Sequence, residues 1–288
     1  MTKGQAHSPV TNGQAEGLTA NGRVKGIGAG PPGWRAALLV VEGFWVWYRR
    51  NWRATLISSV SQPLLVLLAF GVGFGSLVRS SETIGGVPYL VYLAPALLVM
   101  AAVQSAAVES TWPIMSAFKW QRTYFAIIAT PVTIGQLLAG QLLWIALRLL
   151  FSGAAYLAVI ALFGGIGGWG ALGSLLFAIL CAMAFSAPVV ALSAATTRES
   201  SVFNALFRFV VVPMTLFSGT FFPVSQLPVW GRVLAWVSPL WHGTELARGA
   251  ALGTLRPLPA AGHVAYLGAL LAIGVLLARW RYVNRLEV

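Results

Sequence analysis

Residues 217–228 read FSGTFFPVSQLP, a stretch that interrupts a long apolar run with two prolines five residues apart. Pro223 lacks the N–H that would continue a helix, and its ring disfavours helical geometry at Phe222. Pro228 suits the first position of a new helix, which should stop before Pro239. The apolar positions between Pro228 and Pro239 are too few to cross about 30 Å of hydrocarbon.

Non-helical backbone at membrane depth is tolerated only where protein or water covers it. We therefore interpret residues 223–243 as a re-entrant helical hairpin that enters the outer leaflet before the last span. The alternative is an amphipathic helix lying flat on the outer surface. The residues assigned to the re-entrant element are Ser218, Gly219, Phe221, Phe222, Pro223, Pro228 and Trp230.

The composition of the whole chain predicts an all-α integral membrane protein. Of 288 residues, 58% are hydrophobic and 9% are charged, whereas a soluble domain carries roughly 25% charged residues. The net charge of +12 fits anionic membrane lipids and membrane topology better than nucleic acid, which we do not expect as a partner. The single cysteine, Cys181, lies in an apolar run and cannot form an intrachain disulfide.

Six apolar runs are each long enough to cross a bilayer. They cover residues 55–78, 88–111, 133–162, 170–196, 203–222 and 260–279. Before them, residues 34–53 carry charges on one helical face and aromatic side chains on the other, which predicts a helix in the membrane interface. A soluble amphipathic helix packed on another protein is the alternative. Residues 1–33 are predicted to be a disordered cytoplasmic tail, and residues 34–288 a single transmembrane domain.

The basic residues are distributed unevenly between the two sides of the membrane. With the amino terminus inside, nine lie on the inner side and four on the outer side. The inner set is Arg49, Arg50, Arg53, Lys119, Arg122, Arg198, Arg279, Arg281 and Arg285, and the outer set is Arg79, Arg232, Arg248 and Arg256. This bias, together with the even number of spans, predicts that both termini are cytoplasmic.

A few charged residues fall within the predicted spans, where a charge costs about 2.5–3.5 kcal/mol at mid-bilayer. At about 1.5 Å per residue, Arg208 lies about 8 Å and Arg148 about 22 Å from the inner surface of the membrane. We expect Glu109, at the inner end of the second span, to pair with Arg208. For Arg148 we expect the carbonyls freed by the break, or Glu245, to be its partners. The alternative is that Arg148 helps to bind an anionic or polar headgroup in the transport path. Glu245 and Arg248, three apart, are expected to pair with each other on the outer side.

The loop between the second and third spans, SAFKWQRTYFAIIATP (116–131), predicts a docking surface for a soluble subunit. Phe118, Arg122 and Phe125 fall at helical spacing, and aromatic and arginine side chains are typical interface anchors. The docking residues are Phe118, Lys119, Trp120, Gln121, Arg122, Thr123, Tyr124 and Phe125. An interfacial anchor beside the lipid headgroups is the alternative.

Enzymatic chemistry is not expected from this chain. It has no G-x-x-x-x-G-K-[ST] loop, and its seven acidic residues are all glutamate, so neither Walker motif is present. The three histidines are scattered along the sequence without the spacing of a metal site. We predict no cofactor, no metal and no catalytic residue.

Two blocks of sequence resemble the type-2 ATP-binding-cassette (ABC) exporter permeases. LFSGTFFPVSQLPVW (216–230) followed by VSPLWHGTELARG (237–249) is similar to their C-terminal signature. YLAPALLVMAAVQSAAVESTWPIMSAFKWQRTYFAIIATPVT (92–133) and LLAGQLLWIALR (137–148) resemble the branch that contains permeases for nodulation lipo-oligosaccharides and polyketide drugs.

The resemblance implies an interfacial helix, six spans and a short re-entrant element. It also implies a homodimer, or a dimer with a close paralogue, in the bacterial plasma membrane, driven by a separate ATPase subunit that binds ATP and magnesium. The expected substrate is amphipathic: a drug-like molecule, a glycolipid or a lipo-oligosaccharide. A secondary transporter or channel, and a membrane scaffold without flux, are the alternatives.

Overall fold

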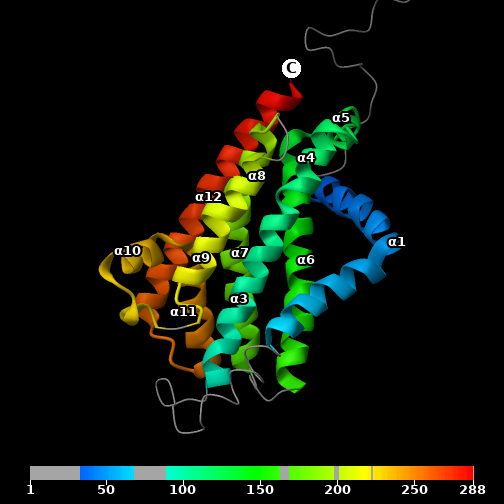
Figure 1. The fold of residues 1–288 in the computed structure, drawn as a ribbon. Helices are drawn as coiled ribbons and strands as arrows, with labels where there is room; N and C mark the ends of the chain where they lie inside the picture. Colours follow the sequence, from blue (N-terminus) through cyan, green and yellow to red (C-terminus); the bar gives the residue numbers. More distant parts are fainter. Residues whose placement is uncertain (1–32, 68–88, 163–168, 198–200, 222, 288) are drawn as a thin grey trace, which may run out of the picture.

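The computed structural model describes residues 33–67, 89–162, 169–197, 201–221 and 223–287. Every regular element within these ranges is a helix, and Figure 1 shows long helices running side by side in an elongated bundle. The predicted all-α class is therefore confirmed for the described part of the chain. Residues 1–32, the outer end of the predicted first span (68–78) and Phe222 lie outside it.

Four helices among the described residues are long and apolar enough to cross a membrane. The first combines α3 (Tyr89–Glu109) with the shorter α4 (Trp112–Lys119), and the others are α6 (Ile134–Leu162), α7 (Trp169–Ala195) and α12 (Pro257–Leu286). They correspond to the predicted second, third, fourth and sixth spans, and α12 extends beyond the predicted span at both ends.

The predicted fifth span is shorter and less regular than expected. It consists of α8 (Ser201–Leu206), a π-helical turn η2 (Phe207–Val211) and α9 (Val212–Phe217). The widened turn directly precedes Pro213, whose ring clashes with the carbonyl four residues earlier in a regular α-helix. That this segment crosses the membrane stays a prediction.

The interfacial helix predicted at 34–53 is not separate from the segment that follows it. The structure joins the two in one helix, α1 (Gly33–Leu67). The sequence between Gly43 and Pro63 contains neither glycine nor proline, so no residue there interrupts helical hydrogen bonding. Figure 1 shows that α1 is instead bent, with two arms that form a V beside α6.

Helix α7 lies at the centre of the bundle, against α3, α6, α12 and α11 (Pro239–Leu252). Two glycines permit close approaches to α7. A Cβ on Gly243 of α11 would lie 2.5 Å from Cys181 Cβ, and a Cβ on Gly274 of α12 would lie 2.5 Å from Pro188 Cδ. α4 and α5 (Thr123–Ile128) lie near the end of the bundle that holds the carboxyl terminus, whereas α10 (Val229–Val237), which follows the break after Phe217, lies in the other half (Figure 1).

Candidate functional site

The predicted docking loop (116–131) does not form a single helix, because the chain turns between α4 and α5. α4 ends with the amides of Trp120 and Gln121 both donating to the carbonyl of Ser116, at 3.0 and 2.9 Å. Arg122 then adopts a left-handed conformation with φ of 51°, which is uncommon for a residue other than glycine. Phe118 therefore lies on a different helix from Phe125, and the predicted shared face is wrong because the chain turns between them.

The inner side of this loop is an aromatic cluster that consists of Phe118, Tyr124 and Tyr282. Phe118 and Tyr124 are 3% and 1% exposed, and the Phe118 ring centroid lies 4.8 Å from that of Tyr124 and 4.9 Å from that of Tyr282. The Tyr124 hydroxyl donates to Gln141 Oε1 on α6 at 2.8 Å. The cluster thus joins the loop to α6 and α12, and its two loop residues are not available to a partner.

Arg285 completes this cluster from the end of α12. Its guanidinium carbon lies 4.4 Å from the Phe118 ring centroid, and Nη1 donates to the carbonyls of Ala194 at 2.7 Å and Thr196 at 3.1 Å. The last carbonyls of a helix have no intrahelical donor. At the end of α7, Arg285 supplies this donor. The sequence did not single out Tyr282, and it placed Arg285 only among the basic residues of the inner side; their signal was an aromatic residue and an arginine three residues apart after the last apolar run.

The outer side of the loop presents a narrower surface than predicted. Its exposed members are Trp120, Gln121, Arg122, Thr123 and Phe125. Trp120 is 57% exposed and Phe125 37%, and the half-buried Lys119 places its ammonium 5.9 Å from the Trp120 ring centroid. We name residues 119–125, without the buried Tyr124, the exposed strip. Aromatic rings beside two cations are suited to a cleft in a soluble protein.

Arg148 pairs with Glu109, contrary to the prediction that its partners are the carbonyls freed by the break or Glu245. Arg148 Nη1 lies 2.9 Å from Glu109 Oε1, and its guanidinium carbon lies 5.1 Å from the Tyr48 ring centroid. The span that holds Glu109 runs on to Lys119, so Glu109 is about 15 Å from its end at about 1.5 Å per residue. The pair links α3, α6 and α1.

Arg208 does not pair with Glu109 as predicted, because Arg148 occupies that carboxylate. Arg208 lies exposed on the π-helical turn η2. No ion pair joins it to any residue that the structure describes.

The broken stretch begins where α9 ends at Phe217. The hydroxyl of Ser218 bonds back to the carbonyl of Met214 and also lies 2.6 Å from the hydroxyl of Ser238. Gly219 adopts a positive φ of 73°, which glycine accommodates without strain. The backbone thus leaves the helix at a buried point, since Ser218, Gly219 and Thr220 are all buried.

Beyond the break the chain forms a short turn, η3 (Val224–Gln226), and then α10 (Val229–Val237). α10 ends before Pro239, as predicted, but it begins at Val229, with Pro228 at the N-cap instead of at the first helical position. Figure 1 shows α10 lying across the direction of the long helices, at the side of the bundle. Trp230 contacts Phe217 through rings 5.6 Å apart. That this element enters a membrane leaflet stays a prediction.

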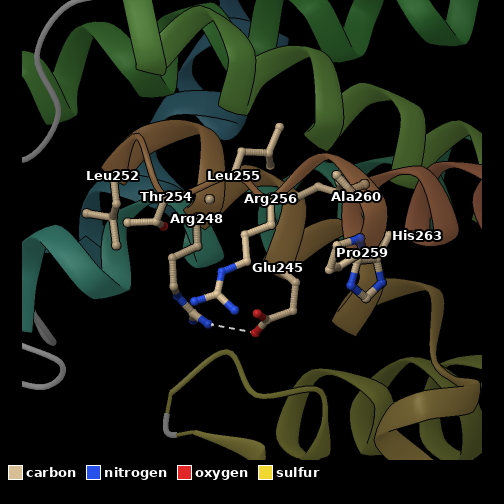
Figure 2. A pocket seen from close by; sticks show the side chains of 11 residues that line it. Glu245, Arg248, Leu252, Thr254, Leu255, Arg256, Pro259, Ala260 and His263 are labelled. Carbon is tan, nitrogen blue, oxygen red and sulfur yellow. Dashed lines mark hydrogen bonds and ion pairs between the residues drawn. The ribbon is translucent and has the colours of Figure 1, made fainter.

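Arg248 holds the broken stretch to the bundle. It pairs with Glu245 at 3.2 Å, as predicted and as Figure 2 shows. Its Nη2 also donates to the carbonyl of Gly219 at 3.1 Å, its Nε to the carbonyl of Tyr92 at 3.3 Å, and its guanidinium carbon lies 3.8 Å from the Tyr92 ring centroid. The carbonyl freed by the break is therefore bound by Arg248, not by Arg148 as the sequence suggested.

Two of the histidines that looked scattered in sequence meet in the structure. The Nδ1 atoms of His242 and His263 lie 2.7 Å apart, and His242 Nε2 lies 2.9 Å from the carbonyl of Trp236. A carbonyl only accepts, so His242 Nε2 carries the proton and His263 Nδ1 donates to His242 Nδ1. Within the described part of the chain, no group of three histidine, cysteine or acidic side chains is placed to hold a metal.

Residues 36–252 match the ABC-2 type transporter family. Proteins named Nodulation protein J are similar to this chain over most of its length. The protein from Sinorhizobium fredii (strain NBRC 101917 / NGR234) is 29% identical, covering 84% of this chain and 93% of the relative. The one from Rhizobium meliloti (strain 1021) is 30% identical over 81% and 89%, and the one from Rhizobium leguminosarum bv. trifolii 31% over 72% and 80%. The bundle of apolar helices and these matches together establish that the chain is a multi-pass membrane protein of the ABC-2 type transporter family, in the branch of Nodulation protein J.

Proposed function

We propose that this ABC exporter membrane subunit is driven by a separate ATPase that docks on the exposed strip. The observation that carries the proposal is the architecture of the α4–α5 loop. Its exposed side offers Trp120, Arg122 and Phe125 to a partner, while its inner side is fixed by Phe118 and Tyr124. A partner that moves the strip must therefore also move α6 and α12, because the aromatic cluster contacts both.

The proposed orientation places this end of the bundle, with both termini, in the cytoplasm of a bacterium. Lys119, Arg122, Arg279, Arg281 and Arg285 all belong to the helices or loop at this end. Such clustering of basic residues is typical of the cytoplasmic side of the plasma membrane. Two copies of the chain, or one copy with a close paralogue, would form the transporter, as the family resemblance implies.

The proposed substrate is amphipathic: a drug-like molecule, a glycolipid or a lipo-oligosaccharide. The six predicted spans contain one acidic residue, Glu109, and it is already paired with Arg148. Proton- or ion-coupled transporters use intramembrane acids as relays, so this chain offers little for ion coupling. Within this class, the resemblance to permeases for nodulation lipo-oligosaccharides favours the lipo-oligosaccharide, and relatives named Nodulation protein J match most of the chain.

The test is to purify the tagged protein from native membranes and assay ATPase activity in the eluate. The variant Arg122→Glu should reach the membrane at the normal level yet lose about tenfold or more of the co-purifying activity, as expected for an interface anchor. The matched control is Arg281→Glu, since Arg281 is also exposed near this end but lies outside the strip. Normal activity with Arg122→Glu would contradict docking at the strip. Wild-type protein without any associated ATPase would favour a secondary transporter or a scaffold.

A further inference from the structure

A cavity of about 200 Å³ lies between the end of α11 and the start of α12, beside the Arg248 contact. Its polar lining consists of Glu245, Arg248, Thr254, Arg256 and His263. Pockets for drug-sized ligands have roughly 300–1,000 Å³. The cavity is therefore suited to one polar group and not to a whole amphipathic molecule.

The cavity has an excess of positive charge. Figure 2 shows the guanidinium groups of Arg248 and Arg256 turned toward the same space as the Glu245 carboxylate. Glu245 is bonded by Arg248, whereas the Arg256 side chain forms no hydrogen bond or ion pair with any other described residue. Two guanidinium groups thus face one carboxylate, which leaves a surplus charge of one at Arg256.

The two arginines differ in how firmly they are held. Arg248 is 8% exposed and is fixed by the carbonyls of Tyr92 and Gly219 as well as by Glu245. Arg256 is exposed and precedes α12 without capping it through its side chain. One guanidinium is therefore preorganised, and the other is free to close over a bound group.

We propose that this cavity binds a phosphodiester group, with Arg256 as its principal contact. A phosphodiester carries a single negative charge, which matches the surplus, and a guanidinium binds phosphate oxygens through two parallel hydrogen bonds. The apolar lining at Leu252, Leu255 and Pro259 suits the carbon chains on either side of the ester. The group would come from an anionic lipid headgroup or from a soluble phosphodiester.

The position of the cavity gives binding a structural consequence. Arg248 lines the cavity and also holds Gly219, where the helix breaks. A phosphodiester there would reinforce the attachment of the broken stretch to α11. That this end faces the outer leaflet rests on the proposed function, whereas the binding itself does not.

The experiment uses the full-length chain, purified in detergent without an ATPase, so its failure is separate from failure of the docking proposal. Native mass spectrometry would measure binding of dihexanoyl phosphatidylglycerol, with dihexanoylglycerol, which lacks the phosphate, as the comparison ligand. Arg256→Gln should weaken phosphatidylglycerol binding about tenfold, as expected when charge-assisted hydrogen bonds are lost. Arg256→Lys should weaken it less, because the charge remains.

Two further variants separate a site from general electrostatic attraction. Glu245→Gln should strengthen binding, because it removes the competing carboxylate while Arg248 keeps its two carbonyl partners. Arg281→Gln removes the same charge from the other end of α12 and should leave binding unchanged. Equal losses in Arg256→Gln and Arg281→Gln, no loss in Arg256→Gln, or equal binding of dihexanoylglycerol would each overturn the proposal.

Competition distinguishes the two sources of the group. Glycerophosphoglycerol, the soluble phosphodiester without acyl chains, is added to the complex with phosphatidylglycerol. Displacement at similar concentrations supports a site for soluble phosphodiesters. Displacement only at far higher concentrations supports a lipid headgroup site.

Discussion

Near the carboxyl-terminal end of the bundle, Arg285 binds the carbonyls with which α7 finishes. In the other half, Arg248 binds the carbonyl of Gly219, where α9 breaks off. Each guanidinium also lies over an aromatic ring, Phe118 in one case and Tyr92 in the other. In both places a long cationic side chain supplies the donors that a helix end in a largely apolar protein lacks.

The two arginines differ in depth, and their surroundings differ accordingly. Arg248 is almost fully buried and has a carboxylate partner in Glu245. Arg285 is half-buried, and no carboxylate among the described residues pairs with it. A guanidinium that keeps contact with water does not need a counter-charge, whereas a buried one does. Arg285, the shallow arginine, supports the exposed strip through Phe118. Arg248, the deep arginine, lines the cavity between α11 and α12.

Removing the deep arginine should have the largest effect on stability. Arg248→Gln removes the charged donor from the buried carbonyl of Gly219, breaks the hydrogen bond to the Tyr92 carbonyl and the contact with the Tyr92 ring, and leaves the half-buried Glu245 without its partner. We therefore expect a loss of about 2–4 kcal/mol in the free energy of unfolding. Unfolding in detergent measures it. The control is Arg232→Gln, because Arg232 also binds two carbonyls but is only half-buried. Equal losses in both variants would show that burial of Arg248 does not add to its contribution to the free energy of unfolding.

Removing the shallow arginine should cost less. Arg285→Gln loses the hydrogen bonds to three carbonyls at the end of α7 and the contact with the Phe118 ring. Because Arg285 is only half-buried, water can replace part of these bonds, and we expect a loss of about 1–2 kcal/mol. The same unfolding measurement applies, with the exposed Arg281→Gln as control. If Arg285→Gln were as damaging as Arg248→Gln, depth would not explain the difference between the two ends.

Mild acid should affect the Arg248 half of the bundle in particular, because the two paired histidines lie there. Burial lowers the pKa of His242, and its contact with the Trp236 carbonyl opposes this shift. In the unfolded chain His242 is protonated near pH 6.5, whereas in the folded chain it is protonated only at lower pH. The free energy of unfolding therefore falls as the pH drops below about 6.5.

The measurement is the unfolding temperature at pH 7.5 and at pH 5.5. His242→Gln should reduce the difference between the two temperatures, because glutamine does not titrate. The expected effect is small, because His242 is only half-buried. A difference that is unchanged in His242→Gln would place the acid sensitivity elsewhere in the chain.

The long helices α3, α6 and α7 were predicted to within about two residues. Each is a continuous apolar run whose ends are marked by proline, glycine or polar residues, and such signals act locally. The same reasoning failed at α1, where the sequence changes from amphipathic to apolar without a residue that stops a helix. A change in composition alone does not end helical hydrogen bonding.

Side-chain partners were predicted well only when they were close in sequence. Glu245 and Arg248 are three apart on one helix, and they pair as expected. Glu109 and Arg148 lie on different helices, and their pairing was missed because the depth of Glu109 depends on how far its span continues past it. Tyr282 and Arg285 were missed for the same reason: their partners belong to α4, α5 and α7.

The sequence by itself determined that this protein is helical, lies in a membrane and breaks its chain before α10, because hydropathy and proline geometry are properties of neighbouring residues. It placed the break at Pro223, whereas α9 already ends at Phe217. Only the tertiary structure decided that Arg148 meets Glu109, that Phe118 and Tyr124 turn inward, and that Arg248 binds Gly219. Those contacts depend on the rotation of each helix about its axis and on its shift along its neighbours. Many distant residues set both quantities together, and no short stretch of sequence encodes either one.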